Sequence, residues 1–141
     1  MRMLDVNVLV YAHRQDSPQH QPVLAWLENL INSDEAFALS ELVLSGFLRI
    51  VTHPKIFNPP SSWDDAHQFV KQLRGHPHAV IVAPQNRHWA IFTKLCEQAN
   101  AKGNLIPDAY HAALAIESGS EWITTDRDFS RFSGLRWSLP E

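Results

Sequence analysis

The sequence predicts an α/β fold in which a short parallel sheet is covered by helices on both faces, giving three layers. Short apolar segments that suit buried strands alternate with longer segments whose apolar residues recur at helical spacing. This alternation favours parallel strands joined by crossover helices. The chain has 141 residues and contains no repeat, low-complexity tract or linker, so one domain spanning residues 1–141 is expected.

The first strand is expected within Met3–Tyr11, a nearly unbroken apolar run that is long enough to be buried on both faces. An unpaired charge is prohibitively unfavourable in such an interior, so Asp5 is expected where this strand emerges. Shorter strands are expected at residues 36–39, 79–83, 122–124 and 135–139. The strand at 79–83 is expected to be buried on both faces.

Apolar residues at helical spacing predict the intervening helices, which are expected to begin at Pro18 or Pro22, Ser40, Trp63, Trp89 and Pro107. The helix capped by Ser40 carries apolar residues nearly all the way round, so it is expected to be deeply packed. Trp63 and Trp89 are expected on core-facing stripes, with a protein–protein interface as the alternative for some of this aromatic surface. The helix from Pro107 is expected to stop at Gly119.

Composition narrows the class of protein. The formal net charge of −3 argues against a basic nucleic-acid-binding module. It does not argue against a nuclease, whose acidic site contacts phosphate through bound cations. The single cysteine, Cys96, excludes an internal disulfide and fits a reducing compartment. No apolar run is long enough to cross a bilayer, so a cytoplasmic protein without membrane association is expected.

Four carboxylates stand at strand exits or helix starts. Asp5 and Asp126 follow expected strands, whereas Glu41 and Asp108 lie in the first turns of expected helices. Each has a purely structural explanation as well, because Asp caps helices and acids complement the positive end of the helix dipole. In an open parallel sheet, however, these positions meet at one edge.

Four carboxylates gathered in one cleft would repel one another. Two charges about 5 Å apart at an effective dielectric near 20 repel by roughly 3 kcal/mol. Carboxylate oxygens suit Mg²⁺ or Mn²⁺, whereas zinc prefers His and Cys ligands. The reaction that such a site performs on phosphodiesters is metal-assisted hydrolysis.

Four segments resemble the acidic motifs of the PIN-domain family. They are Leu4-Asp5-Val6-Asn7-Val8-Leu9, Ser40-Glu41-Leu42, Pro107-Asp108-Ala109-Tyr110-His111-Ala112-Ala113 and Thr124-Thr125-Asp126-Arg127-Asp128-Phe129. Within this family the chain is most similar to the VapC toxins of toxin–antitoxin pairs. The resemblance implies a PIN-like fold and a Mg²⁺- or Mn²⁺-dependent endoribonuclease. It also implies a VapB-like antitoxin as partner and a homodimer.

The resemblance also implies roles for individual residues. Asp5, Asp108 and Asp126 would hold the principal ion, while Glu41 would orient water or a second ion. Water activated by the ion would then attack the RNA phosphodiester. Asn7 and Thr124 become supporting hydrogen-bonding residues, and Asp128 is an alternative to Asp126.

Further side chains are candidates for contacts around this site. Arg14, Arg49 and Arg127 are candidates for RNA binding, with surface ion pairing as the alternative. His111 shares a helix face with Asp108, so it is expected either beside the metal site or in simple packing.

Three other functions are alternatives to the nuclease. A phosphoacceptor receiver domain also gathers acids at strand ends, but it needs a lysine at a late strand end, and no Lys follows Lys102. A haloacid-dehalogenase-like phosphatase would need an aspartate in place of Asn7. A catalytically silent binding module that keeps the acids for structure is the third alternative.

Overall fold

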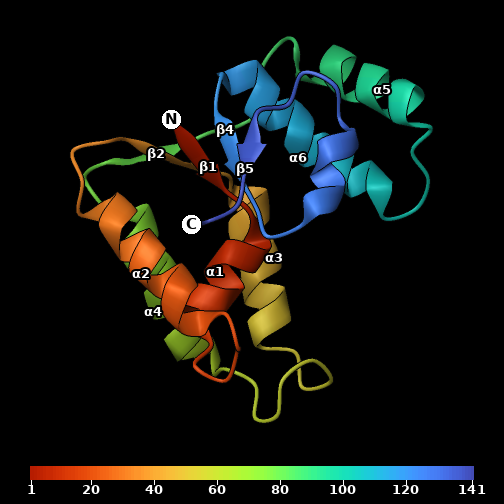
Figure 1. Ribbon diagram of the computed structural model, residues 1–141. Coiled ribbons are helices and arrows are strands. Elements are labelled where there is room, and N and C mark those ends of the chain that lie inside the picture. The colour runs from red at the N-terminus through yellow and green to blue at the C-terminus, as the bar shows by residue number, and fades with distance from the viewer.

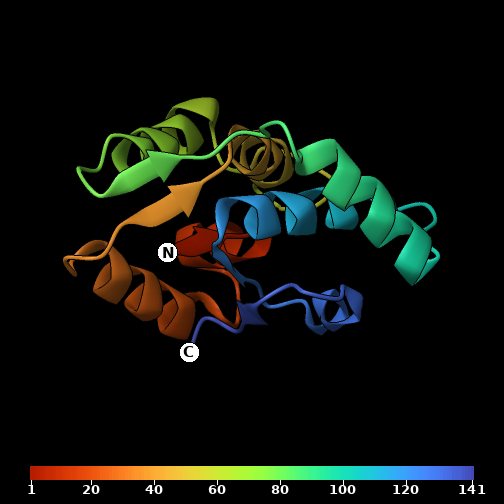
Figure 2. The same cartoon turned by 90° about the horizontal axis from the view of Figure 1, so that it is seen from above.

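The computed structural model describes all 141 residues and contains a five-stranded sheet in the order β3-β2-β1-β4-β5. Its strands are β1 (Arg2–Leu4), β2 (Phe37–Leu39), β3 (Ala79–Ile81), β4 (Glu121–Ile123) and β5 (Trp137–Ser138). All neighbouring strands are parallel. Helices lie on both sides of the sheet (Figures 1 and 2), which confirms the predicted three-layer α/β architecture.

The helices are α1 (Val6–His13), α2 (His20–Ile31), α3 (Glu41–Val51), α4 (Trp63–Arg74), α5 (His88–Ala99) and α6 (Leu105–Ser118), followed by the 3₁₀ turn η1 (Arg127–Arg131). The hydroxyl of Ser40 accepts a hydrogen bond from the Val43 backbone N–H, so α3 begins where its cap predicts. Gly119 ends α6 in the left-handed conformation that glycine adopts without strain.

The long first strand is a wrong prediction. Strand β1 ends at Leu4, and Asp5 caps α1 by accepting a hydrogen bond from the Val6 backbone N–H at 2.6 Å. The rest of the apolar run forms α1, whose Val8, Leu9 and Val10 are buried. A buried helix and a buried strand produce the same unbroken apolar pattern, and β-branched valines favour a strand on propensity alone.

Other differences concern exposure and element starts. Strand β3 lies at the sheet edge, so Val80 and Ile81 are each 38% exposed rather than buried. Trp63 and Trp89 are 56% and 67% exposed, against the prediction of core-facing stripes. Helix α2 begins at His20 without a side-chain cap, and α6 begins two residues before Pro107.

Helices α1 and α3 start from the neighbouring strands β1 and β2 and lie side by side (Figure 1). Gly46 of α3 permits this approach, because a Cβ atom there would lie 3.2 Å from Val6 Cγ2. The two helices and α6 therefore bring side chains together beyond the carboxyl ends of the central strands. None of the helices has the length and apolarity that crossing a membrane requires.

Candidate active site

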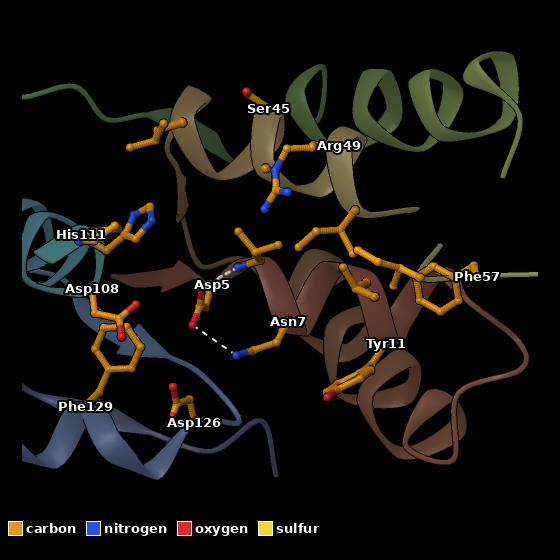
Figure 3. A pocket seen from close by; sticks show the side chains of 17 residues that line it. Asp5, Asn7, Tyr11, Ser45, Arg49, Phe57, Asp108, His111, Asp126 and Phe129 are labelled. Atoms are coloured by element: carbon orange, nitrogen blue, oxygen red, sulfur yellow. Dashed lines mark hydrogen bonds between the residues drawn. The ribbon is translucent and has the colours of Figure 1, made fainter. Parts of the chain in front are cut away.

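A cavity of about 630 Å³ lies where α1, α3 and α6 meet beyond the central strands. Figure 3 shows Asp5, Asp108 and Asp126 toward one end of it, with Tyr11 and Phe57 at the other. Arg49 of α3 is the one arginine or lysine that lines the cavity. The cavity thus has an acidic end and an aromatic end. This is the strand-end position at which ligands bind in open α/β sheets.

Asp5 is held by three hydrogen bonds. Its carboxylate accepts from the Val6 backbone N–H at 2.6 Å, from Asn7 Nδ2 at 3.1 Å and from Thr124 Oγ1 at 2.7 Å. Thr124 is fully buried, and its Oγ1 also accepts from the Asp126 backbone N–H at 3.0 Å. One hydroxyl therefore links the acid after β1 to the acid after β4.

Asn7 joins the same two chain segments from its position on α1. Its Oδ1 accepts a hydrogen bond from the Thr125 backbone N–H at 3.1 Å, while its Nδ2 lies 3.2 Å from Thr124 Oγ1. Both polar ends of the amide are therefore used within the network. These contacts are of the supporting kind that the sequence predicts for Asn7 and Thr124.

The carboxylates at the acidic end disfavour one another's negative charge. Burial raises the pKa of Asp5 to about 6, hydrogen bonds from Thr124 and the Val6 N–H oppose the rise, and the charges of Asp108 and Asp126 add to it. Burial also raises the pKa of Asp108, helped by the negative charges of Asp126 and Asp128. A cation at this end would relieve both effects.

The donor set of the acidic end fits Mg²⁺ or Mn²⁺. Its ligating atoms are carboxylate oxygens, which these hard cations prefer. No three His, Cys, Asp or Glu side chains converge closely enough to hold a metal ion by themselves. That arrangement suits Mg²⁺, which usually keeps several waters and binds one or two carboxylates together with substrate phosphate. It does not suit a structural zinc site, which needs four protein ligands.

Glu41 does not join the other three acids. It begins α3 one turn before the cavity-lining Ser45, but it does not line the cavity itself. Its mostly exposed carboxylate accepts a hydrogen bond from Arg74 Nη2 at 2.9 Å. The expectation that all four carboxylates meet in one place is therefore wrong for Glu41. The sequence pattern does not reveal that Arg74 is near enough to pair with Glu41 at the surface.

Of the two aspartates that follow β4, Asp126 lines the cavity and Asp128 does not. The backbone N–H of Asp128 donates to Asp126 Oδ1 at 2.9 Å. The Asp128 carboxylate is 71% exposed and lies 3.7 Å from Arg131 Nη2. Asp128 therefore orients Asp126 through its backbone, while its own side chain faces solvent.

His111 lines the cavity one helical turn after Asp108 and also packs in the core. Its ring stacks on Trp122 with centroids 5.4 Å apart and an interplanar angle of 16°. Burial lowers the pKa of His111 to about 4, so the imidazole is neutral near pH 7. His111 thus lines the cavity and also packs against Trp122. It adds no positive charge to the acidic end.

The structure separates the three arginine candidates. Arg49 lines the cavity. Arg127 lines a different and smaller cavity, together with Thr125 and the C-terminal residues. Arg14 binds Asp16 and the Pro59 carbonyl, and its side chain is only 12% exposed. Only Arg49 is thus placed to meet a phosphate at the acidic end.

Sequence reasoning missed the aromatic end of the cavity. Tyr11 falls within the apolar run at 3–11, and Phe57 lies in a proline-containing loop without periodicity. The one available signal is an aromatic residue within a polar, proline-rich loop. Arg74, the partner of Glu41, gave no signal at all.

The raised pKa of Asp5 makes a prediction about stability without divalent ions. Between its unfolded value of 3.8 and about 6, the folded state binds this proton more tightly than the unfolded state does. Stability from this group is therefore lost as the pH rises through that window, by about 3 kcal/mol in total. Relative to Asp5→Asn, the wild-type protein should lose stability between about pH 4 and about pH 7 in EDTA. Parallel denaturant titrations of both proteins measure this difference, and a constant difference would contradict the assignment.

Comparison with known proteins agrees with this geometry. Residues 2–135 match the PIN domain family. VapC ribonuclease Mb2897 of Mycobacterium bovis is 45% identical over 140 residues, which are 99% of this chain and 95% of that protein. Ribonuclease VapC25 of Mycobacterium tuberculosis is 41% identical over 140 residues, which are 99% of each chain.

Solved structures share the fold. VapBC2 from Rickettsia felis, crystallised with a DNA fragment from their promoter, matches with a TM-score of 0.72 at 20% identity, over 98% of this chain and 97% of that chain. VapC20 from Mycobacterium tuberculosis, a sarcin-ricin loop cleaving toxin, matches with a TM-score of 0.67 at 13% identity, over 96% and 99%. The sequence matches together place this chain in the PIN-domain family, among its VapC ribonucleases.

Proposed function

We propose that this VapC-type ribonuclease hydrolyses RNA phosphodiester bonds at the acidic end of the cavity, with Mg²⁺ or Mn²⁺ as cofactor. The observation that supports this most is the set of three carboxylates, two of them with raised pKa values, facing a single arginine. Asp5, Asp108 and Asp126 would hold the ion, one or two of them directly and the rest through the waters that Mg²⁺ keeps. When bound, such an ion lowers the pKa of water and stabilises the negative charge that develops on phosphate.

The chain's own side chains would order the reactants. Thr124 and Asn7 fix the Asp5 carboxylate, and Thr124 also fixes the backbone at Asp126. Arg49 would donate hydrogen bonds to a phosphate oxygen from the opposite wall of the cavity. Glu41 lies one turn before the cavity-lining Ser45. After its ion pair with Arg74 breaks, its carboxylate would orient water or a second ion.

Membership of the family suggests which proteins bind this chain. Relatives have been crystallised as toxin–antitoxin complexes, including VapBC2 from Rickettsia felis and VapBC from Salmonella typhimurium. We infer that a VapB-like antitoxin inhibits this chain, that the chain is a single domain that forms a homodimer, and that it meets its RNA in the cytoplasm. The exposed Trp63 and Trp89 are suitable contact residues for such interfaces.

Incubation of the purified protein with total bacterial RNA in millimolar Mg²⁺ tests the proposed function. The nuclease is expected to yield discrete fragments that mapping of RNA ends can identify. The same reaction in the presence of radiolabelled acetyl phosphate tests the receiver-domain alternative. Intact RNA at micromolar protein, in both Mg²⁺ and Mn²⁺, would contradict the proposal and favour the silent binding module.

Substitution of Arg49 tests its contact with phosphate. We expect Arg49→Gln to raise KM for RNA by about 10- to 100-fold, since a hydrogen bond to a charged group contributes ~1.5–3 kcal/mol. Arg127→Gln removes the same charge outside the cavity and is the matched control, so it should change KM little. Steady-state cleavage of one labelled RNA by both variants measures the contrast. Equal effects of the two substitutions would contradict a specific role for Arg49.

A further inference from the structure

The aromatic end of the cavity has no part in holding a metal ion. Tyr11 and Phe57 are half-buried, and Ile50 and Ile56 line the same cavity. Figure 3 shows both aromatic side chains in the same cavity as Asp5, on the far side from Asp108. The acidic end and the aromatic end belong to one cavity. Such a cavity suits a ligand with a charged group at one end and a flat apolar group at the other.

The Arg14 guanidinium packs on one face of the Phe57 ring. The Arg14 guanidinium carbon lies 4.3 Å from the ring centroid. That guanidinium is fixed by bidentate hydrogen bonds to Asp16 at 2.9 and 2.6 Å and by another to the Pro59 carbonyl at 2.9 Å. Arg14 does not line the cavity, whereas Phe57 does. Arg14 therefore covers one face of the ring, and the side chain contributes to the cavity wall.

The distance between the two ends suits one nucleotide. Asp5 caps α1, and Tyr11 lies six residues later on the same helix, which corresponds to about 9 Å at 1.5 Å per residue. Arg49 faces this interval from α3 on the opposite wall (Figure 3). A phosphate between the acidic end and Arg49 would thus leave the adjoining base within reach of Phe57 and Tyr11.

We propose that Phe57, supported by Arg14, and Tyr11 bind the nucleobase of a nucleotide next to the cleaved phosphate. This inference rests on the proposed function, because it requires RNA at the acidic end. Unpaired bases stack on aromatic rings, with Arg behind such a ring adding a cation–π contribution. Tyr11 lines the same cavity and carries a hydroxyl that can form a hydrogen bond. The aromatic end then selects RNA with an unstacked base beside the cut.

The test compares Phe57→Leu with Phe92→Leu on the RNA that the wild-type protein cuts in total bacterial RNA. A labelled oligoribonucleotide spanning that cut is made intact and with an abasic site at each flanking position in turn. On the intact oligonucleotide, Phe57→Leu is expected to raise KM about 5- to 100-fold with little change in kcat, as loss of one stacked base predicts. Phe92 is a half-buried aromatic residue of α5 outside the cavity, so Phe92→Leu is expected to change neither.

The abasic substrate isolates stacking from folding. At one flanking position, removal of the base should raise the wild-type KM by a similar factor and abolish the difference between wild type and Phe57→Leu. Phe57→Tyr keeps the ring and should behave as wild type. Equal KM values for wild type and Phe57→Leu on the intact oligonucleotide would overturn the inference. A higher KM for Phe57→Leu than for wild type on both abasic substrates would also overturn it. Unaffected wild-type cleavage of both abasic substrates would also overturn it, even if Phe57→Leu did not fold. Failure of the wild-type protein to cut any RNA would instead refute the proposed function itself.

Discussion

Replacement of Asp5 with Asn is expected to reduce kcat/KM for RNA by at least about 10³-fold, because a catalytic cation contributes several kcal/mol to transition-state stabilisation. Asp5 is the most buried of the three cavity acids and makes contacts to both α1 and the segment after β4. An amide in its place keeps an oxygen that can accept from the Val6 N–H, but it lacks the negative charge that holds a cation.

The fold should survive this substitution. Burial and neighbouring acids already disfavour the Asp5 charge, so its removal relieves repulsion near neutral pH. The midpoint of thermal unfolding in EDTA is therefore expected to be unchanged or higher. Asp34→Asn removes one acid from an exposed loop and is the matched control. Near-wild-type cleavage by Asp5→Asn, with Asp34→Asn also active, would refute the role of Asp5.

Removal of divalent ions with EDTA is expected to lower the cleavage rate by about 10³-fold or more, for the same reason. Addition of excess Mg²⁺ or Mn²⁺ should restore the rate. A zinc-selective chelator should have no effect, since the cavity offers carboxylate oxygens and no cysteine. Time courses on one labelled RNA measure all three conditions. Full cleavage in EDTA, or loss of cleavage with the zinc-selective chelator alone, would contradict a Mg²⁺ or Mn²⁺ site.

The sheet and the acids at its edge could be predicted because their signals are local. Ser40 marks the start of α3 through its own hydroxyl, and an apolar triplet followed by a polar residue marks the end of β2. Asp5 and Asp126 could be placed at strand exits for the same reason. The resemblance to the PIN-domain family then supplied which acids belong together.

What could not be predicted depends on tertiary contacts. The run at 3–11 spans the end of β1 and most of α1, and it is similarly apolar in the two elements. The pairing of Glu41 with Arg74 and the support of Phe57 by Arg14 join residues more than 30 positions apart. Such pairs have no sequence periodicity, so the exposed position of Glu41 and the aromatic end of the cavity emerged only with the structure.

The central claim is that a divalent cation, with its bound waters, binds at the acidic end formed by Asp5, Asp108 and Asp126. Calorimetric titration of Mg²⁺ into the wild-type protein and into Asp5→Asn, at neutral pH and with non-cleavable RNA present, tests it most directly. We expect a saturable binding event at millimolar or lower Mg²⁺ for the wild-type protein and none for the variant. Identical heats for the two proteins, or no binding by the wild-type protein even with RNA, would contradict the claim.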